Sequence, residues 1–203
     1  MTVCGVGSHS HADRGDDFYP TPPEAVYSLL AIERLKIPHM LWEPACGDGA
    51  IANILREQGY HVVASDIVDR GCPDSEVMDF LAAADEFNTE GIITNPPFKL
   101  AREFVDAALD AAPYVAMLLR LAFLEGASRL EWFASQPLAR VHVASRRLPM
   151  MHRSGWEGKK AGSAVCHAWF VFERGWWRRP EIHWFDWRDH MPAANDNVRA
   201  EAA

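Results

Sequence analysis

The stretch GIITNPPF, residues 91–98, joins an apolar segment to an unusually rigid ending. Ile92, Ile93 and Thr94 are β-formers and predict a buried strand. Pro96 and Pro97 have fixed φ angles and no N–H to donate, and a residue that precedes a proline is pushed toward extended geometry. The pattern therefore predicts a strand that ends in a stiff elbow with free carbonyls and the Asn95 amide at its tip.

Such an elbow suits a planar –NH2 group. The side-chain oxygen of Asn95 and the carbonyl of Pro96 can each accept one amine hydrogen, and Phe98 can stack on the ring that carries the amine. This combination indicates methylation of a conjugated nitrogen. The alternative is a proline-rich turn with Phe98 as an ordinary core residue, since a tetrapeptide alone is a weak signal.

A second motif, EPACGDG at residues 43–49, lies between a predicted strand and a predicted helix. Its glycines let the backbone approach a ligand closely, and the helix start offers free N–H groups. The segment is not G-x-G-x-x-G, and it lacks the Lys-Ser/Thr of a P-loop. The motif therefore predicts a ligand site that does not hold phosphates.

Acidic residues end the next two predicted strands. Asp66 is placed to accept hydrogen bonds from two ribose hydroxyls, and Asp79 with Phe80 could hold an amine and a ring face. Taken singly, each acid is better explained as a helix cap or solvated surface residue than as a ligand, and Asp48 is the clearest case because it begins a helix. Their order along the chain favours a cationic nucleoside, and S-adenosylmethionine is such a molecule.

Strands and helices alternate through most of the chain, which predicts an α/β fold of Rossmann-like type with a mostly parallel sheet. A helix is expected from Pro22, with Thr21 as its N-cap and Glu24 completing a capping box. Two strand-like runs, 139–145 and 165–173, have no good helix between them and predict an antiparallel hairpin at the sheet edge. Residues 184–187 could add a short strand. The remaining expected strands are 40–43, 61–65, 77–78, 91–94 and 115–121, and the remaining helices are 50–58, 81–87, 101–112 and 126–135.

Length and composition predict one domain over residues 18–190, with a flexible N-terminus, 1–17, and a flexible tail, 191–203. No run of 18 apolar residues and no signal region is present. The four cysteines are widely spaced, which predicts reduced thiols in a cytoplasmic protein. The histidines and cysteines form no metal-binding spacing, so no metal is expected.

The net charge of −8 hides an uneven distribution. Residues 1–95 carry 5 basic and 16 acidic side chains, whereas residues 120–179 carry 11 and 4. A basic loop, 146–163, lies between the last two predicted strands of the hairpin. It could follow a nucleic-acid backbone, or it could be a long hairpin loop without a ligand. Its candidate contact residues are Arg146, Arg147, Arg153, Trp156, Lys159 and Lys160.

Together these motifs resemble the S-adenosylmethionine-dependent N6-adenine DNA methyltransferases. The cofactor motif precedes the catalytic motif, as in the gamma arrangement, and small prophage-type members are most similar. The resemblance implies catalytic roles for Asn95, Pro96, Pro97 and Phe98. It implies cofactor binding by Tyr19, Thr21, Glu43, Pro44, Ala45, Cys46, Gly47, Asp48, Gly49, Asp66, Ile67, Asp79, Phe80 and Asn95.

The resemblance implies DNA as the partner, with RNA as an alternative. Larger relatives carry a separate target-recognition domain, for which this chain has no room. Two other functions stay open: methylation of a protein glutamine, whose amide has the same –NH2 geometry, and S-adenosylmethionine binding without catalysis. The sequence leaves the oligomeric state and the recognition sequence unassigned.

Overall fold

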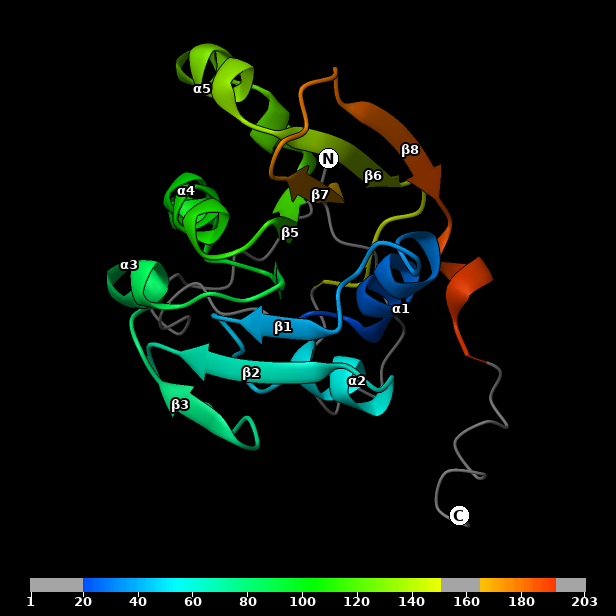
Figure 1. Cartoon of the computed structure of the whole chain (residues 1–203). Helices are drawn as coiled ribbons and strands as arrows, with labels where there is room; N and C mark the ends of the chain where they lie inside the picture. Colours follow the sequence, from blue (N-terminus) through cyan, green and yellow to red (C-terminus); the bar gives the residue numbers. More distant parts are fainter. Residues whose placement is uncertain (1–19, 151–164, 193–203) are drawn as a thin grey trace, which may run out of the picture.

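The computed structural model describes residues 20–150 and 165–192. In this part of the chain eight strands form one sheet in the order β3-β2-β1-β4-β5-β7-β6-β8 (Figure 1). The flexible ends and most of the basic loop that the sequence predicts lie outside the described residues. The strands are β1 (Met40–Glu43), β2 (His61–Asp66), β3 (Ser75–Val77), β4 (Gly91–Thr94), β5 (Tyr114–Arg120), β6 (Leu138–Ala144), β7 (His167–Glu173) and β8 (Glu181–Phe185).

Strand β7 alone runs against the other described strands. It is inserted between β5 and β6 and pairs antiparallel with both, whereas all other neighbouring pairs are parallel. The predicted α/β fold with a mostly parallel sheet and an antiparallel pair is thereby confirmed. The pair is not the sheet edge, because β8 adds a parallel strand outside β6.

Helices cover both faces of the sheet (Figure 1). Helices α1 and α2 pack with Leu41 and Trp169 on one face, while α3, α4 and α5 pack with Trp42 and Phe170 on the other. Adjacent residues of one strand thus enter opposite cores, as the alternation of a pleated strand requires. The helices are α1 (Pro23–Ile32), α2 (Ala52–Glu57), α3 (Phe80–Ala83), α4 (Ala101–Ala111) and α5 (Leu130–Ser135).

The predicted N-cap of the first helix is wrong. Helix α1 begins at Pro23, its N-cap is Pro22, and no side chain caps it. The Thr21 hydroxyl instead accepts a hydrogen bond from Asn95 Nδ2 at 3.0 Å. The first turn of α1 is therefore tied to the end of β4.

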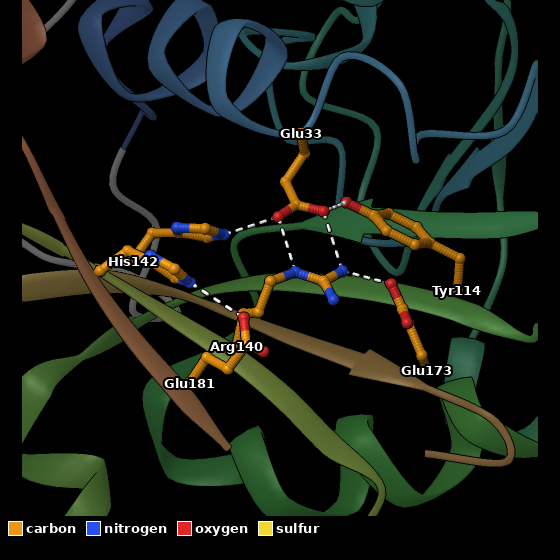
Figure 2. A network of polar contacts seen from close by, with 7 residues as sticks. Glu33, Tyr114, Arg140, His142, Glu173 and Glu181 are labelled. Carbon is orange, nitrogen blue, oxygen red and sulfur yellow. Dashed lines mark hydrogen bonds and ion pairs between the residues drawn. The ribbon is translucent and has the colours of Figure 1, made fainter. Parts of the chain in front are cut away.

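The other end of α1 is fixed by a buried ionic network (Figure 2). Glu33, the C-cap of α1, is 1% exposed. Arg140 of β6 donates to both of its oxygens, at 2.7 and 2.9 Å, and His142 Nε2 lies 2.7 Å from Oε1. Arg140 also pairs with Glu173, and the Tyr114 hydroxyl lies 3.5 Å from Glu33 Oε2. The network anchors α1 to three strands.

The chain order places a crevice at the carboxyl end of β1. From β1 the chain continues to β2 on one side, whereas the neighbour on the other side is β4. Loops leaving two such strands diverge, and open α/β sheets bind their ligands at this point. The loop after β1 is the EPACGDG motif, and the loop after β4 is the NPPF elbow.

Candidate functional site

A cavity of about 790 Å³ opens at this switch point. Its volume lies within the roughly 300–1,000 Å³ that is usual for small-molecule sites. The residues that line it come from the loops after β1, β2, β3 and β4 and from the segment before α1. Of the predicted site residues, those in the lining are Thr21, Glu43, Pro44, Ala45, Cys46, Asp48, Asp66, Ile67, Asp79, Phe80, Asn95, Pro96, Pro97 and Phe98.

The glycines of the first loop shape the cavity wall without lining it. Gly47 and Gly49 have φ angles of +56° and +87°, a region that other residues enter only with strain. A Cβ on Gly49 would lie 2.7 Å from Asn53 Nδ2 and 2.9 Å from Cys72 Sγ. Both positions favour glycine because the turn is left-handed, and Gly49 requires it because the turn is also closely packed there.

Asp66 joins the first two loops. Its Oδ2 accepts a 2.9 Å hydrogen bond from the Gly47 N–H, and its Oδ1 accepts one from the Val68 N–H at 3.1 Å. Arg70 lies 3.9 Å from Oδ1 and was not among the predicted site residues, although it lines the cavity. The backbone contacts fix the carboxylate at the end of β2, and each oxygen keeps a second lone pair for a ligand.

Glu43 is a buried acid with one unused oxygen. Its side chain is 2% exposed, and Oε2 has no hydrogen-bond partner among the described residues. Burial raises the pKa of Glu43 well above its usual value, and the nearby Asp48 and Asp66 add to the effect, while a hydrogen bond from the Ala52 backbone opposes it. An unpaired buried oxygen is costly, which makes Glu43 Oε2 a candidate acceptor for a ligand in the cavity.

The third loop presents an aromatic ring and a helix start. The Asp79 carboxylate caps α3 by accepting from the Leu81 N–H at 3.1 Å. Phe80 is buried, with its ring edge-on to Trp42 at 5.1 Å between centroids and tilted against Phe104 at 4.9 Å. Packing thus fixes Phe80 as one apolar wall of the cavity.

The NPPF elbow faces these acids across the cavity. Because Asn95 Nδ2 donates to Thr21, the amide is held in a defined orientation. Thr21 is itself buried, so the contact is shielded from water. Pro96, Pro97 and Phe98 follow along the same wall before α4 begins.

Two residues that the sequence reading missed contact Phe98. The Arg120 guanidinium carbon lies 4.3 Å from the Phe98 ring centroid, and the His167 ring lies 5.7 Å away, tilted by 38°. Arg120 ends β5 and His167 begins β7, and the two residues are paired across these strands. No local motif marks them, because the contact depends on β7 lying beside β5.

The basic loop is described only at its start. Arg146 forms an ion pair with Asp186 after β8, with 3.0 Å between Nη2 and Oδ2. Arg147 lies near His167, since its charge helps to lower the pKa of that imidazole. The remaining predicted nucleic-acid residues, Arg153, Trp156, Lys159 and Lys160, and the predicted cofactor residue Tyr19 lie outside the described residues.

Residues 20–150 and 165–192 contain no group of three or more His, Cys, Asp or Glu side chains placed to hold a metal ion. They also contain no helix that is long and apolar enough to span a membrane.

The sequence matches no protein-family model and no curated protein. Solved structures do match. A protein from Pyrococcus horikoshii that is assigned as an RNA methyltransferase aligns with a TM-score of 0.59 at 16% identity, over 78% of this chain and 87% of the other. A modification subunit from Vibrio vulnificus, assigned to a type I restriction enzyme, aligns with a TM-score of 0.56 at 13% identity, over 91% and 49%.

A third match adds a ligand. Magnesium protoporphyrin IX methyltransferase from Synechocystis, solved with bound S-adenosylmethionine, aligns with a TM-score of 0.52 at 12% identity, over 75% of this chain and 78% of the other. The chain has the fold of the S-adenosylmethionine-dependent methyltransferases. In this methyltransferase fold, the cavity described above lies at the carboxyl ends of the parallel strands.

Proposed function

We propose that this protein transfers a methyl group from S-adenosylmethionine to the exocyclic N6 amine of adenine in DNA. One observation carries the proposal: the NPPF elbow and the acid-bearing loops after β1, β2 and β3 line a single cavity. The elbow suits an amine, and the acids suit a cationic nucleoside. Both ligands would therefore meet in one enclosed space.

The residues present fit S-adenosylmethionine. Asp66 is fixed by backbone N–H groups and can accept from ribose hydroxyls, while Phe80 offers an apolar wall for a base. The unpartnered Oε2 of Glu43 gives a positively charged group an acceptor inside the cavity. Asp48 and Asp79 add negative charge at its rim. When bound, the cofactor supplies an electrophilic methyl group on a sulfonium.

The chain's own residues position the target amine. Asn95 Oδ1 and the Pro96 carbonyl accept one amine hydrogen each, which turns the nitrogen lone pair toward the centre of the cavity. Phe98 stacks on the base, and base–aromatic stacking contributes about 1–3 kcal/mol. This offsets part of the few kcal/mol needed to remove a base from a duplex. Positioning of this kind can lower a barrier by roughly 7–11 kcal/mol in favourable cases, so no strong general base is required.

The positive charges near the elbow favour DNA over other substrates that have an –NH2 group. The exposed cations Lys99, Arg120 and Arg147 flank the elbow and suit a polyanion better than a protein glutamine. The matched structures include a protein assigned as an RNA methyltransferase and a modification subunit assigned to a type I restriction enzyme. Adenine in RNA is therefore the second candidate.

Methyl transfer from labelled S-adenosylmethionine to unmethylated DNA, total RNA and protein extract tests the proposal, with mass spectrometry of the digested products. We expect N6-methyladenine in DNA. Asn95→Ala should reduce transfer at least 100-fold while leaving cofactor affinity in calorimetry within about three-fold, because Asn95 holds the acceptor amine. The matched control Asp66→Ala should weaken cofactor binding about ten-fold or more, since charge-assisted hydrogen bonds contribute about 1.5–3 kcal/mol.

Label confined to RNA or to glutamine would replace the substrate. Near-normal transfer by Asn95→Ala would remove the elbow from catalysis. Tight cofactor binding with no label on any substrate would instead favour a binding protein without catalysis.

A further inference from the structure

Arg120 packs against the aromatic residue of the NPPF elbow. Its guanidinium lies over the Phe98 ring at 4.3 Å, yet Arg120 is not part of the cavity lining, whereas Phe98 is. The ring therefore separates the cavity from the guanidinium. Arg120 is exposed, and it forms no ion pair with any carboxylate of the described residues. An exposed cation thus lies beside the Phe98 ring of the elbow.

His167 supports this arrangement from the opposite strand. It is paired with Arg120 in the β5–β7 register, which places the two side chains on one face of the sheet. The imidazole is 4% exposed. Burial, together with the charges of Arg120 and Arg147, lowers its pKa to about 4. The histidine is therefore neutral at pH 7, and it packs against Phe98 without adding positive charge.

A target nucleotide brings an anionic phosphodiester group that could pair with the Arg120 guanidinium. A base that leaves the stack and enters the cavity against Phe98 carries its phosphodiester groups at the cavity mouth. A planar guanidinium binds phosphate oxygens through two parallel N–H groups. A glutamine side chain brings no such group, so this feature separates the two substrate classes.

We propose that Arg120 binds a backbone phosphate next to the flipped nucleotide, with His167 as the residue that keeps Phe98 and Arg120 in place. The inference rests on the proposed function, because it assumes that the amine belongs to a nucleic acid. Phosphate capture would add substrate affinity directly at the catalytic elbow. DNA and RNA share the phosphodiester, and the test below includes both.

The test compares the full chain with Arg120→Gln, Arg120→Lys and a matched control, Arg178→Gln. Arg178 is also an exposed arginine stacked on an aromatic ring, 5.3 Å from the Trp177 centroid, but it follows β7 at the opposite end of the sheet. Binding of fluorescein-labelled, adenine-containing DNA and RNA oligonucleotides is measured by anisotropy at salt concentrations from about 50 to 200 mM.

Loss of one phosphate contact should lower the slope of log K against log salt by about 0.9 for duplex DNA or about 0.7 for a single strand. For Arg120→Gln this corresponds to roughly ten-fold weaker binding near 0.1 M salt. Arg120→Lys should restore most of the slope, and Arg178→Gln should match the wild type. Whichever nucleic acid shows the change identifies the source of the phosphate.

A second measurement separates phosphate binding from support of Phe98. Methyl transfer to deoxyadenosine, which has no phosphate, should be nearly unchanged in Arg120→Gln. An unchanged salt slope, or equal loss of transfer to deoxyadenosine and to the oligonucleotide, would overturn the phosphate role while leaving the proposed function intact. Failure of the wild type to bind either nucleic acid would overturn both.

Discussion

Two buried glutamates, one at each end of the sheet, have pKa values that are shifted in opposite directions. Glu33 and Glu43 are 1% and 2% exposed. Burial alone would raise the pKa of Glu33, but hydrogen bonds and charges from His142 and Arg140 outweigh it and lower the pKa to about 2. For Glu43 burial dominates, and its pKa is raised. The first acid is ionised and satisfied, whereas the second is shifted toward its protonated form and retains an oxygen with no hydrogen-bond partner among the described residues.

The difference is the one expected between a buried acid with a structural role and a buried acid that contacts a ligand. A buried ion pair that is complete fixes one arrangement of the elements that it joins. An incomplete polar site costs stability and persists where function requires it. Glu33 lies in a network that joins α1 to β6, while Glu43 lines the cavity. The comparison leads to three measurable contrasts.

The largest expected loss of folding stability follows the replacement of Arg140. Arg140→Ala would leave Glu33 buried without its guanidinium, and breaking a buried pair in this way costs about 3–5 kcal/mol. Urea unfolding should show this loss, while Arg34→Ala, at an exposed position in the turn after α1, should change stability by less than about 0.5 kcal/mol. A small change in Arg140→Ala would mean that water replaces the guanidinium at no cost.

The second expected effect is a loss of folding stability at low pH. Because the folded-state pKa of Glu33 is about 2 against an ordinary value of 4.5, its contribution is complete above pH 4.5 and is lost as the pH falls toward 2. The pKa difference corresponds to on the order of 3 kcal/mol. Denaturant unfolding between pH 2 and pH 5 should show this slope in the wild type, and Glu33→Gln should lack most of it. Equal slopes would assign acid unfolding to other carboxylates.

The smallest effect is expected at Glu43. The protonated form of glutamate resembles glutamine in shape and charge, so Glu43→Gln should change stability by less than about 1 kcal/mol at about pH 4 and below. The raised pKa also predicts that wild-type stability declines as pH rises above the ordinary value, and that Glu43→Gln removes this decline. A large loss in Glu43→Gln would show that Glu43 is ionised and structurally required.

Local patterns were enough to predict the sheet and both motifs. Residues 91–98 and 43–49 carry their geometry in prolines and glycines, so strand, turn and following helix could be read from the sequence. The order of the loops then predicted one shared site, and the cavity does bring Asn95, Asp66 and Glu43 together. Their chemical roles stay predictions.

Long-range contacts could not be predicted in the same way. Thr21 has the sequence of a helix cap, but Asn95, 74 residues away, occupies its hydroxyl instead. Arg120 and His167 meet Phe98 only because β7 inserts beside β5. The partners of Glu33 lie more than 100 residues away, on β6. Each contact depends on strand order, which local periodicity does not contain.

Helix α1 has a consequence for the synthesis of this protein. Its Glu33 needs Arg140, 107 residues later, and the Ala25 carbonyl accepts from Trp169, 144 residues later. At a translation rate of about 5–20 residues per second, the helix leaves the ribosome roughly 5–30 s before these partners have been made. Helix α1 is therefore translated before the strands on which it docks. Since Thr21, just before this helix, accepts a hydrogen bond from Asn95, the NPPF elbow of a nascent chain is fixed only after nearly all of the sheet has been synthesised.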